Sequence, residues 1–71
     1  MLASQKNVNN APSTVKRAMD ILEAFVDADQ PLGVTEISRK VKAHKSTVYR
    51  ILQALFQKGY IHQDPGTNKY S

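Results

Sequence analysis

Apolar residues recur at helical spacing from residue 15 onward. Their i, i+3, i+4, i+7 pattern predicts the buried stripe of an amphipathic helix. Ser13, just after Pro12, is the expected N-cap. The helix is expected to end before the Asp-Ala-Asp-Gln-Pro stretch, because Gln30 precedes a proline. The predicted stripe consists of Val15, Ala18, Met19, Leu22, Phe25 and Val26.

A second, shorter helix is predicted from Glu36 to Val41. Thr35 offers a side-chain oxygen as its N-cap, and the negative charge of Glu36 suits the positive end of the helix dipole. Ile37 and Val41 are four residues apart and therefore lie on one face. We expect this face to pack on the core.

A third helix is predicted from about Lys45 to Lys58, after a tight connection at residues 42–44. Gly59 is expected to end it in a left-handed conformation, with Lys58 carrying a favourable charge in the last turn. The predicted buried stripe consists of Val48, Ile51, Leu52, Leu55 and Phe56.

The pattern then changes to that of a β-hairpin. Residues 60–63 read as a strand, residues 64–68 as a turn and residues 69–71 as the returning strand, and residues 32–34 could add a third strand. The expected fold class is mainly α with a small β-hairpin, a winged helix-turn-helix of three helices plus a wing. It occupies residues 13–71, after a flexible polar tail at residues 1–12.

Composition and charge narrow the range of functions that the chain could have. The chain has 71 residues, no cysteine and a net charge of +4, which indicates one small domain without disulfides or thiolate zinc sites and favours a polyanionic partner. Nothing in it is long and apolar enough to enter a membrane, so a cytoplasmic location is expected. We find no phosphate-binding glycine loop, nucleophile–base pair or paired carboxylates, so neither catalysis nor a cofactor is expected. His44 and His62 are expected to be surface residues, not metal ligands.

The first turns of the third helix carry chemistry suited to reading DNA. In a helix-turn-helix pair, the second helix enters the major groove and presents its N-terminal residues to the bases. Arg50 can pair with guanine, Ser46 and Thr47 can reach bases or phosphates, and these residues lie opposite the predicted core face. The alternative is a merely solvated polar face. The candidate DNA-binding residues here are Lys45, Ser46, Thr47, Tyr49 and Arg50.

The predicted wing supplies a weaker candidate contact through Thr67, Asn68 and Lys69, which could equally be turn formers. Tyr60 and Tyr70 are predicted to form a cross-strand aromatic pair. Acidic residues gather along and after the first helix, and this surface is expected to face away from DNA. They are Asp20, Glu23, Asp27 and Asp29.

Four separated stretches resemble the N-terminal domain of IclR-type regulators. They are VKRAMDILEAF from Val15, PLGVTEISRKV from Pro31, KSTVYRILQALFQKGYI from Lys45 and DPGTNKYS from Asp64. Any one stretch also fits MarR-like or GntR-like winged helices, but their order and spacing are those of the IclR family. The resemblance covers nearly all of residues 14–71.

This resemblance implies a bacterial repressor or activator that binds double-stranded DNA at a palindromic operator as a homodimer or higher oligomer. It implies DNA contacts at Lys45, Ser46, Thr47 and Arg50, and backbone contacts at Arg17, Thr35 and the wing. The family's effector domain, which binds a small molecule, is absent from these 71 residues, so a fragment is expected. The cytoplasmic protein would associate with the nucleoid when bound.

The turn before the third helix departs from the family pattern. A glycine and a proline are common there, whereas this chain has Lys42, Ala43 and His44. If position 42 requires left-handed geometry, lysine costs about 1–2 kcal/mol more than glycine. A different function also stays open, a winged helix that binds proteins instead of DNA. An exposed apolar patch would favour it, and the expected exposed residues contain none.

Overall fold

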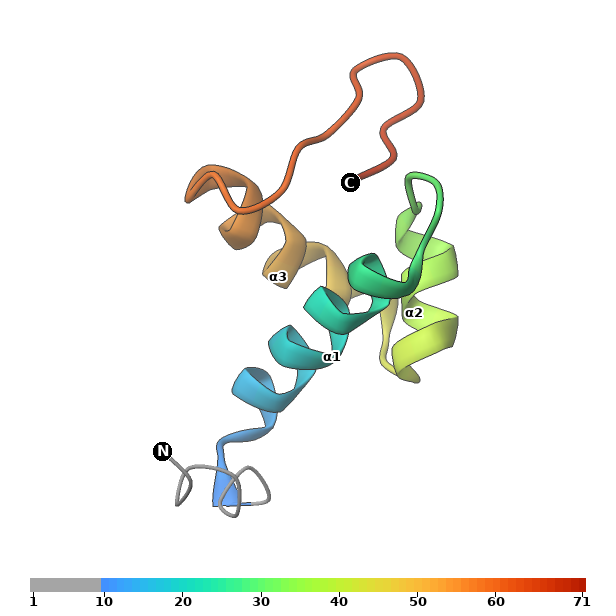
Figure 1. Ribbon diagram of the computed structural model, residues 1–71. Coiled ribbons are helices and arrows are strands. Elements are labelled where there is room, and N and C mark those ends of the chain that lie inside the picture. Colours follow the sequence, from blue (N-terminus) through green and yellow to red (C-terminus); the bar gives the residue numbers. More distant parts are fainter. Residues whose placement is uncertain (1–9) are drawn as a thin grey trace.

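The computed structural model describes residues 10–71 and contains three helices (Figure 1). Helix α1 spans Ser13–Asp27, α2 spans Val34–Val41 and α3 spans Lys45–Gln57. Most of the predicted tail, residues 1–9, lies outside the described residues. The three predicted helices are therefore present, with small differences at their ends.

Helix α1 begins without the predicted side-chain cap. Its N-cap is Pro12, and Ser13 is the first helical residue, so the prediction of a Ser13 cap is wrong. The Pro12 carbonyl accepts the first helical hydrogen bond from the Lys16 N–H, over 3.1 Å. The helix ends at Asp27, where Ala28 adopts an extended conformation.

The buried face of α1 is centred on Ile21, which is fully buried. Ala18, Ala24 and Phe25 are partly buried and pack against the same core. The predicted stripe is wrong at four of its positions, because α1 is apolar on two faces and α2 and α3 cover the face that contains Ile21. The exposed members of that stripe are Val15, Met19, Leu22 and Val26.

Helix α2 starts two residues earlier than predicted. Gly33 is its N-cap, and Glu36 accepts a hydrogen bond from the Gly33 N–H at Oε1, over 2.9 Å. The predicted Thr35 cap is therefore wrong: Thr35 lies inside the first turn, and its carbonyl accepts a hydrogen bond from the Ser38 hydroxyl. The carboxylate of Glu36 does the capping instead, as in one half of a capping box.

The turn between α2 and α3 contains a left-handed lysine. Lys42 has φ of 56° and ψ of 50°, and its N–H donates to the Ser38 carbonyl. Ala43 donates to the same carbonyl over 3.1 Å, which ends α2 sharply and redirects the chain into α3. Position 42 thus has the left-handed geometry for which the family pattern favours glycine. Lysine in this conformation costs about 1–2 kcal/mol more than glycine.

Helix α3 buries Val48, Ile51 and Leu52 as predicted. Leu55 is only partly buried and Phe56 is 41% exposed, so the predicted stripe extends too far toward the C-terminal end. Gly59 has φ of 85°, and the Tyr60 N–H returns to the Leu55 carbonyl over 2.9 Å. The predicted left-handed glycine at the end of α3 is confirmed.

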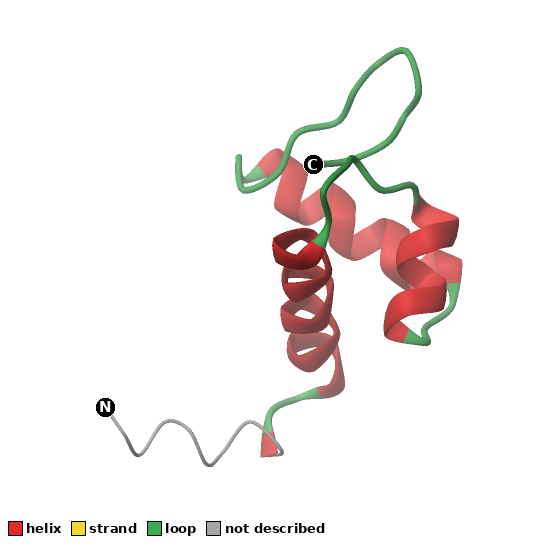
Figure 2. Ribbon diagram, turned by 45° about the vertical axis from the view of Figure 1, so that its right-hand side comes forward, coloured by secondary structure: helices red, strands yellow, loops and turns green. Residues whose placement is uncertain are grey.

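Residues 60–71 fold back as a loop in place of the predicted pair of strands (Figure 2). Only isolated antiparallel bridges form, from Tyr70 to Gln63 and from Tyr70 to Leu32. The predicted third strand at residues 32–34 reduces to Leu32, because Val34 already belongs to α2. The loop still closes the fold: Leu32 and Tyr70 exchange two backbone hydrogen bonds of 2.8 Å.

Tyr70 is a core residue. It is fully buried, whereas Tyr60 is 73% exposed, so the predicted aromatic pair between them does not form. One core contains residues from all three helices, from the loop before α2 and from the loop after α3. They are Ile21, Leu32, Ile37, Val41, Val48, Ile51, Leu52, Ile61 and Tyr70. The fold is a winged helix-turn-helix in which the wing is a hydrogen-bonded loop. Among the described residues, no helix is both long and apolar enough to cross a membrane.

Candidate DNA interface

The N-terminal part of α3 presents a polar surface. Lys45 and Ser46 are exposed and Thr47 is half-buried. They are the first three residues of α3, where backbone N–H groups have no partner within the helix, and His44 provides no side-chain cap. This surface suits an oxyanion such as a phosphate, because it offers free N–H groups, two hydroxyls and the charge of a lysine.

Tyr49 and Arg50 occupy the next turn and are both exposed, Tyr49 by 50%. Arg50 is four residues after Ser46, so the two side chains lie one above the other on the same face of α3. Arg50 also lines a small apolar hollow with residues of α1, chiefly Thr14 and Ala18. All five residues predicted on α3 therefore lie away from the core, as a groove-reading surface requires.

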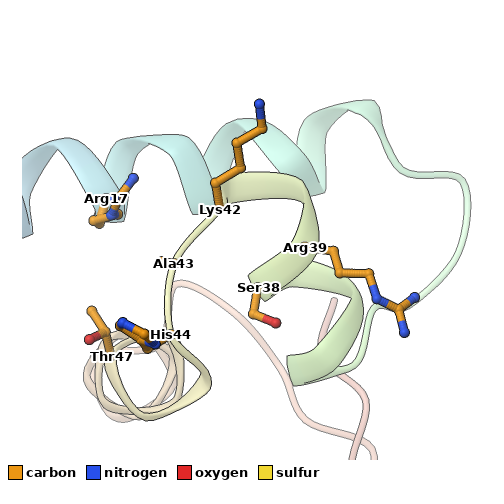
Figure 3. A pocket seen from close by; sticks show the side chains of 7 residues that line it. All are labelled: Arg17, Ser38, Arg39, Lys42, Ala43, His44 and Thr47. Atoms are coloured by element: carbon orange, nitrogen blue, oxygen red, sulfur yellow. The ribbon is translucent and has the colours of Figure 1, made fainter.

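A hollow of about 520 Å³ lies beside this surface, between α1, the end of α2 and the start of α3 (Figure 3). Arg17 projects from α1 on one side of the turn, and Arg39 extends from α2 on the other. The lining is rich in cations and hydroxyls and contains no carboxylate. It consists of Arg17, Ser38, Arg39, Lys42, Ala43, His44 and Thr47.

Arg17 is held in place by the backbone. Its Nη1 donates to the Val41 carbonyl over 3.1 Å, across 24 residues of sequence. The carbonyl belongs to the last residue of α2, where the helix dipole is negative, so this bond fixes the guanidinium beside the turn. The remaining guanidinium donors can still bind an anion.

Of the seven lining residues, only Arg17 and Thr47 were predicted as site residues. The five that were missed are Ser38, Arg39, Lys42, Ala43 and His44. Lys42 was noted only for its backbone geometry, and His44 only as a surface residue. Since the hollow combines residues from α1, α2 and α3, no local motif marks it. The available signal was the helix-turn-helix pattern itself, which brings the residues around the turn close to the start of the next helix.

The tip of the wing is organised by Asp64. The Thr67 backbone N–H and hydroxyl both donate to its Oδ2, over 2.8 and 3.0 Å. These bonds, the backbone one first, hold the pKa of the Asp64 carboxyl below its ordinary value. Asn68 has φ of 64°, a left-handed conformation that asparagine tolerates. Thr67 and Asn68 therefore serve the turn as well as being exposed at the tip.

Lys69 lines a different hollow from the basic one. It lines a hollow at the start of α2 with three carboxylates, those of Asp27, Asp29 and Glu36, and with Lys40. None of the residues predicted on α3 lines this hollow. The structure thus brings Arg17 and Thr47 together but does not group Lys69 with them.

Acidic residues of α1 line a further hollow on the other side of the α2 terminus. Asp20, Glu23 and Asp27 lie there with Lys40 and Lys42. Lys42 lines both this hollow and the basic one, so it marks the boundary between an acidic and a basic surface. Within residues 10–71, no cluster of histidine, cysteine or carboxylate side chains could hold a metal ion.

The amino-acid sequence of this domain matches a known family of proteins. Residues 14–65 match the model of the IclR helix-turn-helix domain. The chain belongs to the IclR family. Its helix-turn-helix domain is a DNA-binding module of transcriptional regulators, and membership decides against the MarR-like and GntR-like alternatives.

Curated relatives support the assignment to the IclR family. The chain is 41% identical over 59 residues to the HTH-type transcriptional regulator KdgR of Dickeya chrysanthemi, a match that covers 83% of this chain and 19% of the relative. It is 39% identical over 57 residues to the HTH-type transcriptional regulator XynR of Escherichia coli strain K12, with 80% and 23% covered. The chain thus spans about a fifth of the length of these relatives.

A solved IclR-family structure has the same fold. The IclR family transcriptional regulator from Brucella abortus superposes with a TM-score of 0.80 at 27% sequence identity, over 94% of this chain and 25% of that one. The arrangement of the helices in this chain is therefore shared with that regulator.

Proposed function

We propose that this IclR-type domain reads a specific double-stranded DNA sequence by placing the start of α3 in the major groove. The observation that carries this proposal is the continuity of the exposed first turns of α3 with the basic hollow, through Thr47, which belongs to both. Cations and hydroxyls suited to phosphates thus lie next to a helix face suited to base edges.

The residues divide by role. Arg50 and Ser46, on the outer face of α3, meet base edges, with Tyr49 beside them. Lys45 and the hollow around Arg17 meet the phosphate backbone, which fixes the register of α3 on the duplex. Thr35, in the first turn of α2, and the wing residues Thr67, Asn68 and Lys69 make further backbone contacts. Residues 13–71 act as the DNA-binding unit, and residues 1–12 as a tail.

The functional protein is proposed to be a bacterial repressor or activator whose homodimer or higher oligomer binds a palindromic operator. A further domain, outside these residues, would bind a small-molecule effector. The chain's own role is binding and not catalysis, in keeping with relatives that are all regulators. Since bacterial chromosomal DNA lies in the cytoplasm, the cytoplasm is where the domain would act.

Selection from a random duplex pool, using this chain, tests the proposal. We expect recovered sequences to share a half-site, and binding to weaken as salt rises, because phosphate neutralisation releases counterions. Affinity should be modest, since one module buries little surface and lacks the avidity of a dimer. Binding that is unchanged between low and physiological salt, or a pool without any shared sequence, would contradict this function.

A protein-binding role is the second candidate, because the structure corrects the expectation that no apolar patch is exposed. Val15, Met19, Leu22 and Val26 form one on α1. Arg17 and Met19 are two residues apart on α1, so their side chains leave the helix about 200° apart. The patch and the basic hollow therefore lie on different sides of α1, and protein contact at one is compatible with DNA contact at the other.

A further inference from the structure

His44 is an exposed residue in the lining of the basic hollow (Figure 3). It is the N-cap residue of α3, but its side chain does not cap the helix. Its backbone is extended, with φ of −67°, a value that suits the proline common in this turn of the family pattern. Neither the backbone nor the core therefore requires a histidine at position 44, and the ring is available to a ligand in the hollow.

The charged and polar groups around His44 come from every element that surrounds the hollow, and none of them is a carboxylate. The acidic residues of α1 line the neighbouring hollow beyond Lys42 instead. Lys45, the residue after His44, adds one more exposed cation. Within this lining, an anionic partner for the ring has to come from outside the chain. The groups that line the hollow with His44 are Arg17 of α1, Ser38 and Arg39 of α2, Lys42 of the turn and Thr47 of α3.

Histidine differs from the other bases of the hollow in the way it carries charge. Arginine and lysine side chains are ordinarily protonated at neutral pH, whereas histidine is the side chain that ordinarily gains or loses its proton between about pH 5 and pH 8. A phosphate of the DNA backbone is negatively charged. An anion close to an imidazole favours its protonated form, which then donates a charge-assisted hydrogen bond to the phosphate oxygen.

We propose that His44 contacts a backbone phosphate of duplex DNA, and that its ring takes up a proton from the solvent when the phosphate enters the hollow. This inference rests on the proposed function and adds to it a further contact residue and a bound proton. His44 and Thr47 are three residues apart and thus lie on one face at the start of α3. A phosphate that accepts a hydrogen bond from the Thr47 hydroxyl is therefore within reach of the ring.

The direction of the pH effect follows from linkage. If the phosphate favours the protonated ring, protonation of the ring must strengthen DNA binding by the same factor. DNA affinity should consequently rise as the pH falls through the range in which histidine titrates, and should fall again as the pH rises. Carboxyl groups ordinarily titrate below this range and lysines above it. His44 and His62, the two histidines of the chain, are thus the side chains to compare.

Titrations of the 71-residue chain with duplex DNA, at constant salt and at several pH values, test the contact. We expect binding on the order of fivefold tighter at about pH 5.5 than at about pH 8, the size of one exposed charge pair. His44→Gln keeps a polar side chain but cannot become charged, so it should lose this dependence. His62→Gln is the matched control and should keep it. Equal pH dependence in His44→Gln and the parent, or none in the parent, overturns the proposal.

A permanent charge at the same position supplies a second arm. His44→Arg carries its charge at every pH in this range, so it should bind DNA at about pH 8 as tightly as the parent binds at about pH 5.5. Weak binding by His44→Arg at both pH values counts against a phosphate contact at position 44. Circular dichroism of both variants should be unchanged, because His44 is exposed.

NMR of the parent chain measures the proton directly. The pH at which the His44 ring resonances titrate should be higher in the DNA complex than in the free domain. The same midpoint in both states overturns proton uptake, independently of any substitution.

Two further comparisons separate this proposal from its alternatives. The pH dependence should be the same on the selected half-site and on an unrelated duplex, since a phosphate carries no sequence information. Dependence confined to the half-site would place the ring on a base edge and overturn the phosphate contact. Salt-sensitive binding without pH dependence would overturn the role of His44 and leave the proposed function standing. Absence of salt-sensitive duplex binding at every pH would contradict the proposed function, and the role of His44 with it.

Discussion

Gln53 on α3 donates a hydrogen bond from Nε2 to the Tyr70 hydroxyl, over 2.9 Å. Gln53 lies on the turn after Arg50, and Tyr70 is the residue that closes the wing loop onto Leu32. The bond gives the phenol of a fully buried side chain its polar partner. It also ties the wing directly to the helix proposed to enter the groove.

Tyr70→Phe should therefore destabilise the fold by about 0.5–1.5 kcal/mol, the net value of one hydrogen bond. Thermal unfolding of the variant measures this. Tyr60→Phe is the matched control and should have no effect, since Tyr60 is exposed. Equal unfolding temperatures for Tyr70→Phe and the parent would show that the bond adds no stability.

Leu52→Ala should destabilise the domain by about 2–5 kcal/mol, enough to unfold much of a small domain. Leu52 is fully buried in the core shared by the three helices. Chemical denaturation followed by circular dichroism checks it, with exposed Gln57→Ala on the same helix as the control. An unchanged midpoint for Leu52→Ala would mean that the wrong face of α3 has been placed inside.

Lys42→Gly should stabilise the domain while it weakens DNA binding. Glycine removes a left-handed penalty of about 1–2 kcal/mol but has a more flexible unfolded chain, worth about 0.5–1 kcal/mol. A net gain of about 0.5–1 kcal/mol is expected. Lys40→Gly loses the same charge but lies inside α2, where glycine should cost about 1 kcal/mol.

DNA titrations of the same two variants complete the comparison. Loss of one phosphate contact should reduce the salt dependence of Lys42→Gly binding by about one unit of slope. A slope equal to that of the parent would remove Lys42 from the proposed phosphate contacts, whatever the change in stability.

Arg50→Ala and Lys69→Ala should differ in kind. Arg50→Ala should cost about 1–3 kcal/mol on the preferred sequence and relax discrimination at one base pair, whereas Lys69→Ala should weaken all sequences about equally. Because Lys69 lies among carboxylates near the start of α2, its effect should be the smaller. Titrations on single-base variants decide it, and uniform weakening by Arg50→Ala would reassign Arg50 to the backbone.

The turn at Asp64 should loosen in acid. Its pKa is lowered by the bonds from Thr67, so the ionised carboxyl favours the folded turn. This contribution is complete above the ordinary carboxyl pKa of 3.8 and disappears as the pH falls through the lower, folded value. The Thr67 amide resonance, followed by NMR, should shift over the same pH range. In Asp64→Asn, this pH-dependent shift should be absent. Persistence of the transition in the variant would assign it elsewhere.

The sequence pattern was sufficient to predict the buried face of a helix where only one face is apolar. Val48, Ile51 and Leu52 were recognised as buried because the opposite face of α3 is polar. In α1, both faces are apolar, and periodicity cannot tell which one packs on the core and which one stays exposed. Ile21 was consequently missed in favour of Met19 and Leu22.

Local capping and distant pairing limited the prediction in other ways. Thr35 is a better N-cap by preference than Gly33, but Glu36 reaches back to the Gly33 N–H and moves the helix start. The wing strands reduce to isolated bridges at Tyr70, whose side chain is fully buried in the core. Members of the basic hollow come from α1, α2 and α3, so only the folded chain could assemble them.

The bridge between Leu32 and Tyr70 also has a consequence for how the molecule folds. The three helices meet through neighbours in sequence, so their packing can begin early and locally. Tyr70 has the largest of the fully buried side chains, and it pairs with a residue far behind it in sequence. Closing so long a loop carries an entropic cost, which places this step late. During synthesis, the helices would thus gather before the side chain that completes their interior has left the ribosome.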